Sequence, residues 1–147
     1  MPSATSTPNS GDEVRHVIDQ WVNALHDRDV TARTSNYASD VLLFDVINPL
    51  QHRGLDALRS RLIAWFSTFQ GPVGCEVRDL TISAGDDVAF CHMLNRFSGT
   101  TAGGPLDMWV RFTVGFHKVE GRWSVTHEHA SVPFDAETGR ASIDLQP

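Results

Sequence analysis

The stretch Gly121-Arg122-Trp123-Ser124-Val125-Thr126-His127-Glu128-His129 decides how this chain is expected to fold. It predicts a turn followed by a strand, in which successive side chains point to opposite faces. Trp123 and Val125 mark one face as buried, and His127 and His129 have the same parity. We therefore expect both imidazoles to point inward. A buried imidazole needs a hydrogen-bond partner or a polar cavity, so this strand predicts a pocket.

Working back from this strand, the apolar residues keep a period of two as far as Gly74. The predicted strands cover about residues 75–83, 87–98, 106–119 and 122–132, with tight turns between them. The earlier half of the chain shows helical spacing instead, and the predicted helices cover about residues 12–26, 30–37 and 55–69, with a short strand over about 41–45. This order indicates an α+β fold, with three N-terminal helices packed on a curved, mostly antiparallel sheet.

The length of 147 residues fits one folded domain. We expect a disordered tail over residues 1–11, the domain over 12–134 and a C-terminal extension over 135–147. The net charge of -6 disfavours nucleic acid and anionic membranes as partners, because both require a basic surface. No apolar run suits a transmembrane helix, and the first ten residues lack the features of a secretory signal. The two cysteines form no disulfide framework, so we expect a cytoplasmic setting.

Several segments resemble one protein superfamily. Residues 21–29 (WVNALHDRD) look like the first-helix signature of the NTF2-like superfamily. Residues 37–45 (YASDVLLFD), followed nine residues later by Gly54, are similar to the ketosteroid isomerase segment that carries the catalytic base. Residues 85–90 and 120–134 resemble the SnoaL-like branch of small bacterial proteins. The resemblance covers about residues 14–134, and it implies a cone-shaped fold with a cavity. The superfamily holds several enzymes and also association domains, so the fold alone does not choose an activity.

The resemblance implies that Asp45 is a general base at the edge of the cavity. The isomerase also uses a tyrosine on its first helix, where this chain has Trp21, and a late-strand acid that this chain lacks. We therefore do not expect steroid isomerisation by the same arrangement. Asp45 can also be a structural cap at the end of its strand, and this alternative stays open.

Histidines could replace the missing groups. By parity His92 points inward like His127, and either imidazole could form an acid–base pair with Asp45. In the predicted register His127 lies near Val114 and His129 lies near Phe112. The alternative is that these histidines are core residues bonded to Tyr37 or to the backbone. The residues expected to bind substrate are Trp21, His129, Trp65, Tyr37 and Phe112.

The strand over about 106–119 has one continuous apolar face, so its other face points outward. That outer face carries Trp109 and Arg111, and an outward tryptophan on a sheet suggests a homodimer interface. Glu128 has the outward parity on the neighbouring strand and could pair with Arg111. A single bulge would reverse this assignment of faces.

These observations predict a protein that binds a small apolar or carbonyl-containing molecule without a cofactor. It could be an isomerase, dehydratase or cyclase that works by Asp/His proton transfer. The alternative is a non-catalytic NTF2-like dimerisation or ligand-sensing domain. His92, His127 and His129 could form a zinc set, but a lone His-x-His is weak evidence, and no metal is expected.

Overall fold

The first helix sets one wall of the molecule. The computed structural model describes residues 9–147, so most of the predicted tail lies outside the described residues. Helix α1 (Ser10–His26) begins after Asn9, whose side chain accepts a hydrogen bond from the backbone N–H of Asp12 at 2.8 Å. An asparagine cap of this kind is typical of helix starts. The helix therefore includes Ser10 and Gly11, which were expected in the tail.

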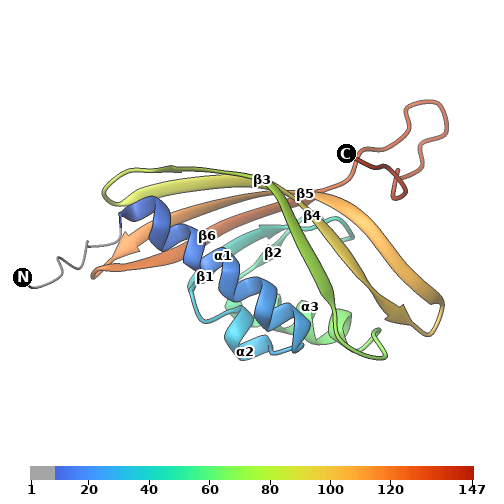
Figure 1. Cartoon of the computed structure of the whole chain (residues 1–147), viewed down its shortest axis with the longest axis horizontal. Coiled ribbons are helices and arrows are strands. Elements are labelled where there is room, and N and C mark those ends of the chain that lie inside the picture. The colour runs from blue at the N-terminus through green and yellow to red at the C-terminus, as the bar shows by residue number, and fades with distance from the viewer. Residues whose placement is uncertain (1–8) are drawn as a thin grey trace, which may run out of the picture.

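The remaining elements form one sheet with two further helices (Figure 1). In chain order they are α2 (Val30–Arg33), β1 (Tyr37–Phe44), β2 (His52–Arg53), α3 (Leu55–Phe66), β3 (Gly74–Ala84), β4 (Val88–Thr101), β5 (Gly104–Val119) and β6 (Arg122–Ser131). The six strands are arranged β2-β1-β6-β5-β4-β3. All neighbours are antiparallel except β1 and β6, which are parallel. The predicted curved, mostly antiparallel sheet is confirmed.

The description of three N-terminal helices is not confirmed as stated. Helix α2 is a single turn of four residues, and α3 follows β1 and β2 rather than preceding the sheet. Tyr37 was predicted to end the second helix, but it begins β1 and is aligned with Val125 of β6. Strand pairing therefore overrides the local helical preference at this residue.

The core lies between α1, α3 and the concave face of the sheet. Helix α1 buries Val14, Ile18 and Trp21 against it, at the spacing of an amphipathic helix. On β5 the predicted inward face is confirmed, and its most buried members are Val110, Val114 and Phe116. Each such side chain contributes roughly 1.5–3 kcal/mol when fully buried. At one end, the indole N–H of Trp123 donates to Glu13 at 2.7 Å and ties β6 to α1.

A bulge in β6 determines which of its residues face the core. Val125 is aligned with Phe116 of β5, while His127 is aligned with Gly115, so Thr126 is an extra residue without a partner on β5. An extra residue reverses the alternation of faces beyond it. Trp123 and Val125 point inward as predicted, but the inward residues after the bulge are Glu128 and Ala130.

Candidate functional site

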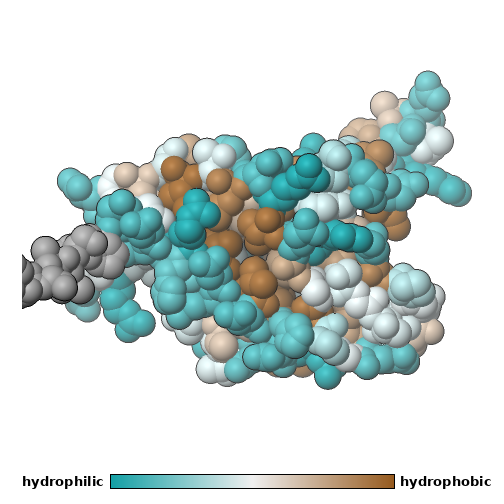
Figure 2. Space-filling view, viewed as in Figure 1, coloured by the Kyte–Doolittle hydropathy of each residue, from teal (hydrophilic) through white to brown (hydrophobic). Residues whose placement is uncertain are grey.

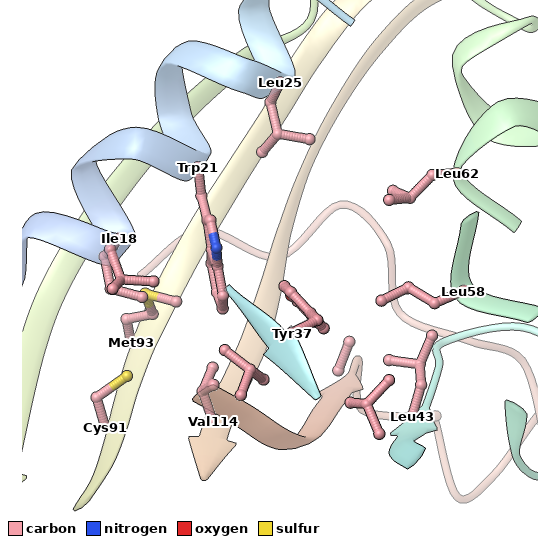
Figure 3. Close-up of a cluster of buried hydrophobic side chains, with 14 of the residues drawn as sticks. Ile18, Trp21, Leu25, Tyr37, Leu43, Leu58, Leu62, Cys91, Met93 and Val114 are labelled. Atoms are coloured by element: carbon pink, nitrogen blue, oxygen red, sulfur yellow. The ribbon is translucent and has the colours of Figure 1, made fainter. Parts of the chain in front are cut away.

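A cavity of about 470 Å³ lies between α1, α3 and the concave side of the sheet. Figure 3 shows Trp21 and Leu25 of α1 on one side of this space and Leu58 and Leu62 of α3 on the other. Figure 2 shows apolar residues gathered among hydrophilic ones near the middle of one face of the molecule. The volume falls within the roughly 300–1,000 Å³ of small-molecule sites.

Most of the lining is apolar, and a few polar groups interrupt it. The apolar lining from the sheet comprises Leu43, Val77, Met93, Phe97, Leu106, Met108, Val110, Phe112 and Ala130, and that from the helices includes Ile18, Trp21, Leu25, Leu58, Leu62 and Trp65. The polar or ionisable lining residues are Arg33, Asp45, Arg61, Thr68, Cys75, Asn95 and Glu128. Such a surface suits an organic molecule with an apolar body and few polar groups.

A buried ionic network forms part of the cavity wall. Nη2 of Arg33, the last residue of α2, donates to Oε1 of Glu128 at 3.1 Å. Tyr37 joins both residues, since its hydroxyl accepts from Arg33 and donates to Glu128. Arg33 is 5% exposed and Glu128 is 2% exposed. Buried charges are tolerated when they are paired in this way.

The aromatic rings around Arg33 support its charge. Its Cζ lies 4.0 Å from the ring centroid of Trp21 and 5.3 Å from that of Tyr37. Burial opposes the charged guanidinium, but Tyr37 and Glu128 outweigh it, so the pKa of Arg33 is raised and the group stays charged. Burial raises the pKa of the Tyr37 hydroxyl well above its ordinary value, and the phenol stays neutral. The network therefore has no net charge.

Asp45 lies on the cavity wall where β1 ends, and Trp21, Trp65 and Phe112 also line the cavity. Its Oδ2 accepts a hydrogen bond from Nε of Arg61 on α3 at 2.6 Å, and its Oδ1 accepts one from the backbone N–H of Val46 at 2.7 Å. These two bonds fix the carboxylate. They also fit the structural role that was left open for Asp45.

Tyr37, which was expected to bind substrate, is buried in the network described above rather than on the cavity surface.

The prediction that the histidines point into the cavity is wrong. Because of the bulge at Thr126, His127 and His129 are aligned with Gly115 and Thr113 on the outer side of β6, not with Val114 and Phe112. Nδ1 of His127 lies 2.7 Å from the carbonyl oxygen of Leu42, which can only accept. The rings of both histidines pack edge-on against Phe44.

His92 also points away from the cavity, because the inward residues of β4 are Ala89, Cys91, Met93, Asn95 and Phe97. The parity assigned to β4 from the sequence was therefore reversed. Among residues 9–147, no group of three or more His, Cys, Asp or Glu side chains is placed to hold a metal ion.

The outer face of β5 carries Trp109 and Arg111, as predicted. The predicted pair of Arg111 with Glu128 is wrong, because the bulge turns Glu128 inward. Arg111 instead donates from Nε to Oγ of Ser131 at 3.1 Å.

The thiol of Cys75 lines the cavity, but burial raises its pKa to about 11. It is therefore protonated near neutral pH and is a poor nucleophile.

Sequence reasoning missed several polar cavity residues, among them Arg33, Arg61, Asn95 and Glu128. One signal pointed to Glu128, since a glycine inside a strand, here Gly115, often marks a bulge. Arg33 carried no comparable signal, because its partners lie on β1 and β6.

The helices on the concave face of the sheet, with the cavity between them, define a small α+β protein of the NTF2-like type. A family model described as a SnoaL-like domain matches residues 14–135. The chain belongs to this SnoaL-like family. No curated protein matches it. Of the described residues, no helix is long and apolar enough to cross a membrane.

Solved structures support the same assignment. An NTF2-like protein of unknown function from Pseudomonas putida KT2440 is 36% identical, with a TM-score of 0.85, over 93% of this chain and 96% of that one. A ketosteroid isomerase-like protein from Erwinia carotovora atroseptica SCRI1043 is 17% identical, with a TM-score of 0.72, over 85% and 97%. An NTF2-like protein with a cystatin-like fold from Novosphingobium aromaticivorans is 12% identical, with a TM-score of 0.71, over 86% and 84%. The last two share the fold alone.

Proposed function

We propose that this protein binds a small, mainly apolar molecule in the cavity between α1 and α3. The observation that carries the proposal is the cavity itself, with its volume of about 470 Å³ and its largely apolar lining. Space of this size that is not filled by side chains forfeits dispersion contacts, and a ligand restores them.

The test is a titration with diphenylmethane, followed through the indole N–H signals of Trp21 and Trp65 in isotopically labelled protein. Both rings line the cavity, so both signals should shift and saturate together. Ala64 is exposed on α3 and lines the cavity, whereas its neighbour Ile63 is exposed and does not. Ala64→Trp should therefore weaken binding about tenfold or more, and Ile63→Trp should leave it unchanged. Equal binding by both variants would contradict the proposal.

A second candidate is an enzyme that transfers a proton without a cofactor, as an isomerase, dehydratase or cyclase does. It is favoured by two carboxylates, Asp45 and Glu128, on the wall of one apolar cavity. Both carboxylates are hydrogen-bonded, but Asp45 is the better candidate for a base, because it keeps partial contact with solvent whereas Glu128 is buried between Arg33 and Tyr37. The histidines on the outer face take no part in this candidate mechanism. Asp45→Asn should abolish turnover of a substrate once one is found, while that substrate still binds.

A further inference from the structure

We propose that Asn95 anchors the ligand and that the ligand is an uncharged alcohol, a hydroxyl group on an apolar body. This inference deepens the proposed function and rests on it. The residue lies on the inward face of β4 and lines the cavity, and it is 5% exposed. It is aligned with Val77 on β3 and Val110 on β5, so its cross-strand neighbours are both apolar.

The amide of Asn95 is not satisfied by the protein. Its Oδ1 has no hydrogen-bond partner within residues 9–147. A buried polar atom without a partner costs about 1–3 kcal/mol, and an apolar residue of similar size would avoid that cost. An asparagine here is therefore explained by a hydrogen-bond donor that enters the cavity.

Two donors on other residues that line the cavity are also without partners. These are Nε1 of Trp21, whose residue is 3% exposed, and Nε of Arg33. The residues that line the cavity thus hold one acceptor and two donors without a hydrogen-bond partner among the described residues. A hydroxyl group is the smallest group that donates and accepts at once.

The charges of the cavity argue for a neutral ligand. Arg33 is paired with Glu128, and Arg61 is paired with Asp45. Each arginine therefore already has a carboxylate, and neither pair leaves a charge for an ionic ligand. A carboxylate or an ammonium group would have to compete with the partner that each charge already has, and breaking the buried Arg33–Glu128 pair carries a high desolvation cost.

The experiment compares three probes of one shape: diphenylmethane, benzhydrol and benzophenone, which carry a methylene, a hydroxyl and a carbonyl group. Their affinities are measured for the wild type and for Asn95→Leu by the indole titration described above. The ratio of the diphenylmethane Kd to the benzhydrol Kd should fall about 2- to 10-fold in the variant, the effect of one net hydrogen bond. Met108→Leu, on the same wall, should leave the ratio unchanged.

Each result separates this inference from the proposed function. An unchanged benzhydrol ratio in Asn95→Leu, with diphenylmethane still bound, overturns the anchor and leaves the cavity proposal standing. A benzophenone ratio that falls as much as the benzhydrol ratio overturns the assignment of an alcohol, because a ketone cannot donate. Failure of all three probes to bind the wild type overturns the proposed function. If Asn95→Leu does not fold, Asn95→Ala serves for the same comparison.

Discussion

Arg33 and Glu128 are 95 residues apart in the chain, and Nη2 of Arg33 lies 3.1 Å from Oε1 of Glu128 in the cavity wall. This contact fastens α2 to β6 beside the bulge and connects the helical layer to the sheet. It also explains why both residues can be charged and nearly inaccessible to water.

Breaking this pair from one side should destabilise the protein strongly. Arg33→Leu leaves the carboxylate of Glu128 buried with only Tyr37 as a partner, so we expect the free energy of unfolding to fall by about 3–5 kcal/mol. The double variant Arg33→Leu/Glu128→Leu removes both charges and should recover much of that loss. Urea unfolding of the wild type, Arg33→Leu, Glu128→Leu and the double variant measures this. If the double variant loses as much unfolding free energy as the two single variants together, the two residues are not coupled and this account is contradicted.

Alkaline pH should weaken the fold through its cysteines. Burial raises the pKa of Cys91 to about 12 and that of Cys75 to about 11, from an ordinary 9.0. The folded protein then holds these protons more tightly than the unfolded chain. The resulting stabilisation is complete below pH 9 and is lost as the pH rises toward 12. Urea unfolding at about pH 8 and pH 10.5 should differ by on the order of 2 kcal/mol for Cys91 alone. The variant Cys75→Ala/Cys91→Ala should show a flatter dependence, and an unchanged slope would contradict this account.

The ion pair of Asp45 and Arg61 should be worth little to the fold. Both side chains keep partial contact with solvent, at 14% and 19% exposure, which weakens their attraction. We expect Arg61→Leu to lower stability by about 1 kcal/mol or less. Asp45→Asn should lower it by about 0.5–2 kcal/mol if the carboxylate acts mainly as a cap for Val46. Thermal unfolding of both variants measures the stability that each change removes, and so separates the ion-pair role of Asp45 from its role as a cap for Val46.

The outer face of the sheet should form a homodimer. Trp109 and Arg111 project from β5 on this side, and Phe90 on β4 is 48% exposed. Sedimentation at micromolar concentration should give a dimer for the wild type, and Arg111→Glu should shift it toward the monomer. Thr113→Glu on the same outer face provides a second test, and a monomeric wild type would contradict the prediction.

The sequence predicted the fold better than the site. Hydrophobic periodicity gave α1 and every strand but the two-residue β2 to within a few residues, because burial of one face imposes that period. Asp45, Trp21, Trp65 and Phe112, which the sequence offered as site residues, line the cavity. His127 and His129 were misplaced because strand parity fails at one extra residue, Thr126, whereas His92 was misplaced because the inward face of β4 was assigned the wrong way round. Arg33 and Asn95 were missed because their significance depends on partners, or on missing partners, that only the folded chain brings near them.

The most direct measurement is a crystal structure of the protein grown with benzhydrol. The account predicts density for the probe between α1 and α3, with its hydroxyl group within hydrogen-bond distance of Oδ1 of Asn95. Density only on the outer face beside Trp109 or Phe44, with the cavity free of the probe, would contradict it.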